Sequence, residues 1–515
     1  MSTPVIHETT YQAEGDKDPA LPTKTRNLRL IGLMAGVVGA IIVYLIFPNE
    51  MSENLQMHLA EKEIETTPDM LAITAAVAVL MGAWWMFEAL PLAATALVPL
   101  VAFPVFQVAT MKEVGASYGS PTIFLFMGGF FLALTMQRWN LHLRIALRTV
   151  LLVGTKPKRL VLGFMIATGF LSMWVSNTAT AVMMLPIGIS VLALVGELDA
   201  QAMKDSKFGT ALMLGIAYSA SIASLSTPIG TPPNAVLRGY LEDSGIELNF
   251  GSWMLFAAPL AWLFLVIGWW LITTIYKPEL DELPGGRKVI EDRLEQMGPM
   301  SNQEKVTAII FVAAACSWIF LPVIWEDSPL DDGVIAMILA VVLFLVPAKP
   351  KEGIRLLDWK TAKDVPWDVL LLFGGGFALS SAFSSSGLSL WIGDVASNLE
   401  GLPTILIVAS LATLIIFLTE ITSNTATAAA FLPITGGIAI GMGVDVQLLV
   451  IPVALAATCA FMLPVATPPN AIAYGSGYIT IGQMIKVGIW LNLIGIVLVT
   501  LFTIFIGPHI LGYSI

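Results

Sequence analysis

The sequence has few charged residues, only two cysteines and only four histidines. Charged residues make up 12% of the 515 positions and hydrophobic residues 56%, whereas soluble domains carry about 25% charged residues. This composition excludes an ordinary soluble domain and predicts a protein integral to a membrane. The two cysteines, Cys316 and Cys459, exclude a disulfide framework, and their apolar surroundings predict inert packing thiols. The histidines lie in tails, loops or segment ends, which excludes a histidine proton relay across the membrane.

Thirteen apolar segments divide the chain, and two of them are too long for one crossing. A membrane-spanning helix needs about 20 apolar residues, which segments 160–196 and 403–440 exceed. Each contains a polar Ser-Asn-Thr sequence with a proline soon after it, and this pattern predicts a re-entrant hairpin of two half-helices. The other segments predict eleven single crossings, at 28–47, 70–87, 90–109, 120–137, 208–240, 252–276, 306–325, 333–348, 366–391, 447–478 and 487–508.

The basic residues predict how these segments are oriented. With a cytoplasmic N-terminus, 23 of the 26 Lys and Arg residues lie inside, and only Lys62, Lys112 and Arg238 lie outside. This asymmetry is what the positive-inside rule requires. The first hairpin then starts and ends inside, the second starts and ends outside, and the C-terminus is outside. We expect no cleavable signal peptide, because the first apolar run is long enough to span the membrane.

Two polar motifs occur twice each inside apolar sequence. Ser176-Asn177-Thr178 and Ser423-Asn424-Thr425 have similar neighbours at an offset of 247 residues, and Thr-Pro-Pro-Asn starts at Thr231 and again at Thr467. A single Ser-Asn-Thr would suggest a helix contact, and a single Thr-Pro-Pro-Asn a kink. Polar groups in lipid cost free energy unless they meet a partner. Two copies of each motif therefore favour one binding site built by two halves of the chain.

The opposite orientation of the two hairpins predicts an inverted repeat. The glycine-rich sequence from Phe126 to Phe130 also recurs from Phe373 to Phe377, again at an offset of 247 residues. We expect these glycines to serve close helix packing. The predicted parts of the chain are a cytoplasmic tail, an extra helix with an outer loop, the first repeat, a cytoplasmic linker and the second repeat, at 1–27, 28–69, 70–276, 277–305 and 306–515.

The repeated motifs can offer ligands for both a cation and an anion. The double proline removes two amide donors and stops the helix, which leaves backbone carbonyls free to bind a hard cation such as Na⁺. The hairpin turn presents the amino end of a half-helix, which favours an anion. None of the four motifs contains Lys or Arg. The charge of a bound anion must therefore be balanced by cations and helix dipoles.

Glu420 is the only charged residue in either hairpin segment. An intramembrane carboxylate predicts a functional role, such as proton coupling. The alternative is that Glu420 braces the hairpin turn through hydrogen bonds. The first half has Met173 at the matching place, which favours bracing.

These motifs resemble those of the divalent anion:sodium symporters, the INDY-like di- and tricarboxylate transporters, over about residues 70–508. The resemblance implies an all-α membrane protein with eleven transmembrane helices and two re-entrant hairpins, working as a homodimer by an elevator movement of a transport domain against a scaffold. It implies that substrate carboxylates bind at Ser176, Asn177, Thr178, Thr231, Ser423, Asn424, Thr425, Thr467 and Pro468. It also implies one sodium site at Ser172, Ser176, Asn177 and Gly230, and another at Thr419, Ser423, Asn424 and Ala466.

The predicted function is non-enzymatic transport across the cell (inner) membrane. We expect import of C4-dicarboxylates such as succinate, malate or fumarate together with Na⁺, by a protein surrounded by lipid and without a nucleic-acid partner. The alternatives are a dicarboxylate exchanger without sodium coupling, a citrate or sulfate transporter of the same fold, and an anion channel. An intramembrane hydrolase is disfavoured because the apolar segments offer no histidine and no paired carboxylates.

Overall fold

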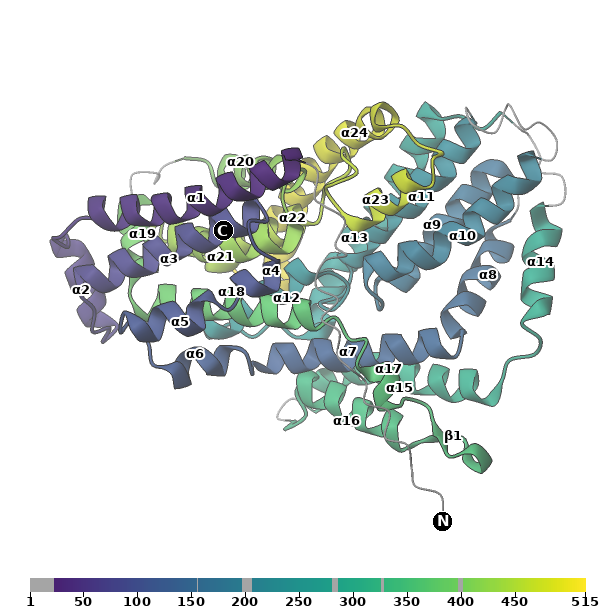
Figure 1. Cartoon of the computed structure of the whole chain (residues 1–515), viewed down its shortest axis with the longest axis horizontal. Helices are drawn as coiled ribbons and strands as arrows, with labels where there is room; N and C mark the ends of the chain where they lie inside the picture. The colour runs from purple at the N-terminus through teal and green to yellow at the C-terminus, as the bar shows by residue number, and fades with distance from the viewer. Residues whose placement is uncertain (1–22, 155, 197–205, 280–285, 326–327, 397–401) are drawn as a thin grey trace, which may run out of the picture.

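The computed structural model describes residues 23–154, 156–196, 206–279, 286–325, 328–396 and 402–515. The predicted tail over 1–27 and the loop after the first hairpin lie largely outside the described residues. The described chain is helical (Figure 1) apart from its loops and one small antiparallel pair of strands, β1 (Pro347–Lys349) and β2 (Ile354–Arg355). A short 3₁₀ turn (Pro350–Glu352) joins these strands, and it ends at Gly353, whose φ of 69° suits glycine.

Seven helical stretches in the described residues are long and apolar enough to cross a membrane: Arg26–Ile46, Pro68–Met86, Met111–Arg138, Phe250–Ile275, Asn302–Ile324, Trp367–Ser385 and Ile481–Leu511. The shorter apolar helices are Leu92–Val105, Asn177–Ala193, Asp332–Leu345, Thr404–Thr419 and Val446–Ala457. The count of eleven crossings stays a prediction. The segment 90–109 does not form one continuous helix, because it contains α4 (Leu92–Thr95) and α5 (Val98–Val105), with prolines at both starts.

One group of helices packs around α7 (Pro121–Arg138) and α18 (Trp367–Ser385). It contains α1 (Thr23–Ile46), α3 (Pro68–Met86), α4, α5, α6 (Met111–Ser117), α15 (Asn302–Ile324), α16 (Asp332–Leu345) and α17 (Trp359–Ala362). The predicted glycine packing occurs here. A Cβ atom on Gly128 would lie 2.7 Å from Ala336, so only glycine allows α7 to approach α16 this closely.

The second group contains both hairpins and both interrupted helices. The first hairpin is α9 (Pro157–Ser172) with α10 (Asn177–Gly196), and the second is α20 (Thr404–Thr419) with α21 (Asn424–Gly441). They pack on α11 (Lys207–Ser224), α12 (Pro232–Asp243), α13 (Phe250–Ile275), α22 (Val446–Ala457), α23 (Pro468–Gly475) and α24 (Ile481–Leu501). Each predicted hairpin is thus two helices that meet at the Ser-Asn-Thr sequence, and each Thr-Pro-Pro-Asn follows a helix break.

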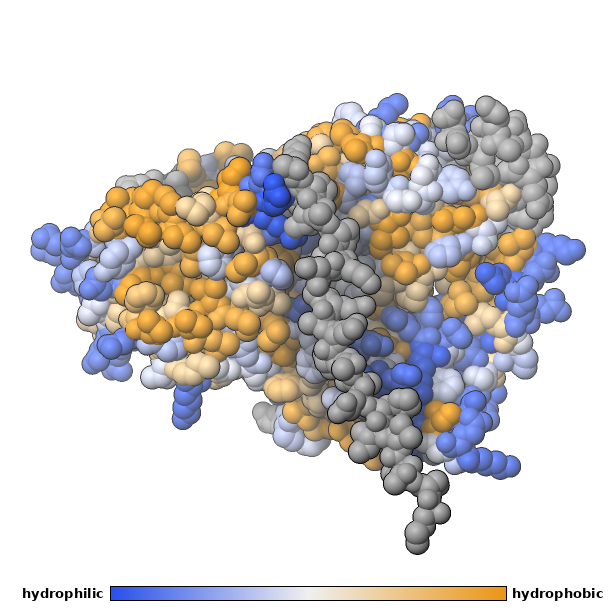
Figure 2. Space-filling view, in the orientation of Figure 1, coloured by the Kyte–Doolittle hydropathy of each residue, from blue (hydrophilic) through white to orange (hydrophobic). Residues whose placement is uncertain are grey.

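The two hairpins lie in opposite halves of the molecule (Figure 1). In Figure 1, α9 and α10 lie in the right half and α20 and α21 in the left half. The polar helix α2 (Glu53–Glu61) is at the left end and α14 (Gly286–Gln296) at the right end. Figure 2 shows hydrophobic side chains over α1, α3 and α5, and hydrophilic ones at both ends and in the lower part of the view to the right of centre. The chain finishes with a π-helical turn (Phe502–Ile506) and α25 (Gly507–Leu511).

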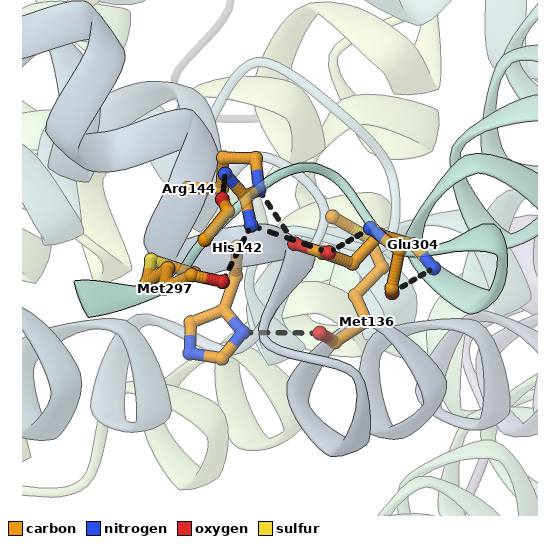
Figure 3. A network of polar contacts seen from close by, with 7 residues as sticks. Met136, His142, Arg144, Met297 and Glu304 are labelled. Carbon is orange, nitrogen blue, oxygen red and sulfur yellow. Dashed lines mark hydrogen bonds and ion pairs between the residues drawn. The ribbon is translucent and has the colours of Figure 1, made fainter. Parts of the chain in front are cut away.

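Helix α8 (Leu141–Val153) is held by a buried ion pair (Figure 3). Arg144 Nε donates to Glu304 Oε1 at 2.6 Å, and Arg144 Nη1 donates to the Gly298 carbonyl at 3.0 Å. Glu304 also accepts a hydrogen bond from Ser301 N at 2.7 Å, within the capping box of α15. Beside this pair, burial lowers the pKa of His142. The sequence allows either an interfacial amphipathic helix or a loop helix here, and the burial of Arg144 shows that it is packed into the fold.

The helix that precedes the second hairpin is shorter than α8, which precedes the first. Helix α19 (Leu388–Ala396) precedes the second hairpin, and its Asp394 accepts hydrogen bonds from Ser52 Oγ at 2.7 Å and Asn54 Nδ2 at 3.0 Å. The segment that carries α2 therefore packs against the second half of the chain.

The two cysteines lie in different environments. Cys459 is buried, and its Sγ lies 3.3 Å from the Leu455 carbonyl oxygen. Cys316 is exposed on α15. The predicted packing role is therefore correct for Cys459 and wrong for Cys316, because apolar sequence in a membrane helix does not distinguish an inward face from a lipid-facing one.

Candidate substrate and sodium site

The serine of each Ser-Asn-Thr motif caps the second helix of its hairpin. Ser176 Oγ accepts a hydrogen bond from Ala179 N at 3.2 Å, and Ser423 Oγ accepts one from Ala426 N at 3.5 Å. Serine is favoured at this position because its hydroxyl satisfies an amide that the helix leaves free. Each turn thereby fixes the amino end of a helix, where the dipole and the free N–H groups favour an anion.

The asparagine of each Thr-Pro-Pro-Asn motif closes the break that precedes it. Asn234 Nδ2 donates to the carbonyl oxygens of Leu225 and Thr227, at 3.2 and 2.9 Å. Asn470 Nδ2 donates to those of Ala460 and Leu463, at 3.1 Å each. No individual role was predicted for these asparagines from the sequence, although their recurrence in the repeated motif was the available signal.

The candidate sodium-binding backbone positions lie in matching turns. Gly230 N donates to the Thr227 carbonyl at 3.3 Å, and Ala466 N donates to the Leu463 carbonyl at 3.2 Å. Both residues are buried. A Cβ atom on Gly230 would collide with the Ser224 carbonyl oxygen, so the first turn requires glycine. The two positions therefore share the same turn hydrogen bond, although only the first turn requires glycine.

Each hairpin touches its interrupted helix through a hydroxyl at the end of its first half-helix. Ser172 Oγ donates to the Ala220 carbonyl at 2.6 Å. At the matching place, Thr419 Oγ1 lies 2.9 Å from the Ala457 carbonyl oxygen and 2.7 Å from Asn424 Oδ1. Hard cations take oxygen ligands of this kind. The second half therefore brings together a hydroxyl, an amide and a carbonyl oxygen that can hold Na⁺.

The two breaks meet, but their threonines have different partners. Thr231 Oγ1 lies 3.4 Å from Thr458 Oγ1, which belongs to the second break. Thr467 Oγ1 accepts a hydrogen bond from Asn470 N at 3.3 Å and so caps α23. Pro468 is exposed. Thr458 has no counterpart in the repeated motifs, so the sequence offered no signal for it.

The remaining predicted residues lie at the turns, and their exposure differs. Ser176, Thr178, Ser423 and Asn424 are partly exposed, whereas Asn177 and Thr425 are each 8% exposed. Among the described residues, no hydrogen bond joins the first Ser-Asn-Thr turn to the second. Among the predicted site residues, the hydrogen bond that joins the two halves is the one between Thr231 and Thr458, at the breaks.

Glu420 links the second hairpin to the second break. Its carboxylate is buried and accepts hydrogen bonds from three successive backbone amides of the break and from Asn492. These contacts favour the bracing interpretation of Glu420 over proton coupling. The described residues contain no group of three or more His, Cys, Asp or Glu side chains arranged to hold a metal ion. The candidate cation ligands are therefore the hydroxyl, amide and carbonyl oxygens.

The paired helix turns and paired helix breaks, among helices long and apolar enough to cross a membrane, define a mostly helical multi-pass membrane protein. The family described as "Sodium:sulfate symporter transmembrane region" matches residues 64–511. The chain belongs to this family, and the family resemblance found in the sequence is confirmed.

Similar proteins match nearly the whole chain. A protein of Staphylococcus saprophyticus named "Sodium-dependent dicarboxylate transporter SdcS" is 44% identical over 497 residues, covering 95% of this chain and 93% of that protein. A protein of the same name from Staphylococcus aureus strain USA300 is 44% identical, covering 85% of this chain and 86% of that protein. The solved structure of the YdaH transporter of Alcanivorax borkumensis has a TM-score of 0.54 and 15% identity, covering 84% of this chain and 98% of that one. At this identity, the likeness concerns the fold alone.

Proposed function

We propose that this protein is a sodium-coupled transporter that imports C4-dicarboxylates such as succinate, malate and fumarate. Relatives that are 44% identical carry the name of sodium-dependent dicarboxylate transporters. One structural observation carries the proposal for the site: each hairpin turn touches its interrupted helix through a matching hydroxyl–carbonyl contact, Ser172 to Ala220 and Thr419 to Ala457. A repeated polar contact of this kind, buried in apolar surroundings, supports a pair of equivalent ion sites.

In the proposed complex, one carboxylate of the substrate lies at each Ser-Asn-Thr turn. The substrate ligands are Ser176, Asn177, Thr178, Thr231, Ser423, Asn424, Thr425, Thr467 and Pro468. One Na⁺ binds Ser172, Ser176, Asn177 and Gly230, and another binds Thr419, Ser423, Asn424 and Ala466. The helix amino ends and the two cations balance the substrate charge, since the four motifs contain no Lys or Arg.

The proposal includes an inverted repeat of residues 70–276 and 306–515, with hairpins that enter from opposite faces of the membrane. The placement of the hairpins in opposite halves of the molecule supports this (Figure 1). It also includes eleven crossings, a cytoplasmic N-terminus, an outer C-terminus and a homodimer in the cell membrane. Transport then occurs by an elevator movement of the hairpin-containing group of helices against the group around α7 and α18.

The experiment is uptake of labelled succinate into liposomes that contain the purified protein, with and without an inward Na⁺ gradient. Uptake that requires the gradient supports the proposal. Uptake that needs internal dicarboxylate and ignores Na⁺ would show an exchanger, and current without stoichiometric Na⁺ would show a channel. Unlabelled citrate and sulfate serve as competitors. If either outcompetes succinate at pH 7.5, the substrate assignment is wrong.

A further inference from the structure

A buried carboxylate occupies the second half of the site and has no counterpart in the first. Glu420 directly follows Thr419, and it is 3% exposed. Its Oε1 accepts hydrogen bonds from Phe461 N at 2.7 Å and Met462 N at 2.9 Å, and its Oε2 accepts one from Leu463 N at 3.0 Å. Helix α22 has already ended at Ala457, so these amides have no helical acceptor. Successive amides aimed at one point form a concavity that suits an anion.

Asn492 completes this arrangement from a third helix. Helices α20, α22 and α24 pack together (Figure 1), and Asn492 on α24 donates from Nδ2 to Glu420 Oε1 at 2.7 Å. Asn492 is fully buried, and its Oδ1 has no partner among the described residues. A buried amide that leaves one atom unpaired costs free energy. Its hydrogen bond to Glu420 is the polar contact that offsets this cost.

The backbone that Glu420 holds leads into the turn that contains Ala466, a ligand of the proposed second sodium site. The Leu463 carbonyl accepts the turn hydrogen bond from Ala466 N at 3.2 Å, and it also accepts Asn470 Nδ2 at 3.1 Å. Fixing the amide of Leu463 therefore fixes the turn that presents the Ala466 carbonyl. On the other side, Thr419 belongs to the same site and is the immediate neighbour of Glu420 in the chain.

The first half makes the same connection with neutral groups. Met173 matches Glu420 at an offset of 247 residues, and Thr227 matches Leu463 at an offset of 236. There, the Thr227 hydroxyl donates to the Met173 carbonyl oxygen. In the first half, a single hydroxyl links the hairpin to the break. In the second half, a carboxylate that accepts four hydrogen bonds makes this link.

We propose that Glu420 and Asn492 form a positioning unit for the second sodium site, and that the first site lacks this unit. All four hydrogen-bond partners of the Glu420 carboxylate are donors, and three of them are the successive backbone amides of residues 461–463. Glu420 therefore holds this backbone, and with it the turn that contains Ala466. Asn492 acts through Glu420. This inference rests on the proposed function.

The test compares the sodium dependence of Asn492→Leu with that of the wild type. Leucine keeps the same number and branching of side-chain heavy atoms and removes one donor from the carboxylate. The Na⁺ concentration for half-maximal succinate uptake should rise by about tenfold, the size expected for one hydrogen bond to a charged group. Succinate affinity at saturating Na⁺ should change by less than about twofold, because no substrate ligand is altered. Thr500→Val is the matched control on the same helix, since the Thr500 hydroxyl has no hydrogen-bond partner among the described residues.

A second variant keeps the test decisive. Glu420→Gln places an amide N–H against the backbone amides and should raise the half-maximal Na⁺ concentration further than Asn492→Leu does. If the two residues act as one unit, the double variant should be no worse than Glu420→Gln alone. If Asn492→Leu does not yield folded protein, Asn492→Ser provides the same comparison.

Three results would overturn the inference. These are an unchanged Na⁺ dependence in both single variants, an equal loss of succinate affinity at saturating Na⁺, or additive effects in the double variant. Thermal stabilisation by Na⁺ without substrate gives a readout that does not depend on transport. A wild-type protein without sodium-dependent succinate uptake would refute the proposed function, while unequal stabilisation of wild type and Asn492→Leu by Na⁺ would still support the positioning unit.

Discussion

The threonines at the two helix breaks provide a quantitative test of the substrate site. Thr231→Val and Thr467→Val each keep the side-chain volume and remove one hydroxyl. Thr231 is 1% exposed, and its hydroxyl has only the long contact to Thr458 at 3.4 Å. It is therefore free to donate to a carboxylate. The Thr467 hydroxyl accepts from Asn470 N, which leaves its own proton available for the substrate.

The two variants should lose similar affinity for succinate but different amounts of stability. A hydrogen bond to a charged group contributes about 1.5–3 kcal/mol, so each variant should raise the Kd of succinate by about 10- to 150-fold at saturating Na⁺. Thr467→Val also removes the cap of α23, which costs about 1 kcal/mol of stability. Thr231 makes no capping hydrogen bond to α12. Thr467→Val should therefore lower the Tm more than Thr231→Val does.

The assay is equilibrium binding of succinate to purified protein at saturating Na⁺, with thermal unfolding measured on the same samples. Thr135→Val is the control, because this buried threonine on α7 bonds only to the Phe131 carbonyl of its own helix, at 2.8 Å. The control should bind succinate with wild-type affinity. Wild-type affinity in both Thr231→Val and Thr467→Val would refute the assignment of these hydroxyls to the substrate.

Three further predictions concern the sodium ligands, the orientation and the packing of α8. Asn177→Ala and Asn424→Ala should each abolish or severely reduce uptake, because each removes an oxygen ligand from the site; wild-type uptake with unchanged Na⁺ dependence would contradict this. A cysteine replacing Lys288 should resist an impermeant thiol reagent applied from outside, and rapid labelling there would show that the linker is not cytoplasmic. Arg144→Met should lower the free energy of unfolding by about 3–5 kcal/mol, because it leaves the Glu304 carboxylate buried without its partner; an unchanged Tm would contradict this.

Most of the architecture that could be predicted from the sequence was predicted from the repeated motifs. A proline pair removes helical hydrogen bonds wherever it stands, and a Ser-Asn-Thr turn caps a helix locally. The hairpin turns that follow Ser172 and Thr419 and the breaks before Pro232 and Pro468 are therefore explained by nearby sequence.

The contacts between distant segments could not be predicted in this way. Asn492 meets Glu420 across 72 residues, and Arg144 meets Glu304 across 160. Neither pair recurs in the other half, so the repeat gave no guide to it. The division of segment 90–109 into α4 and α5 was missed for a different reason. Its continuous apolar composition predicts one crossing, although its prolines favour separate helices.

The most direct test of the central claim is a structure of the protein determined with succinate and Na⁺. We expect one succinate between the two hairpins, with one carboxylate contacting the Ser176–Thr178 turn and the other contacting the Ser423–Thr425 turn. We expect one Na⁺ at Thr419, Ser423, Asn424 and Ala466, and another at Ser172, Ser176, Asn177 and Gly230. Succinate bound to one turn alone, or bound away from both, would contradict a site shared by the two repeats.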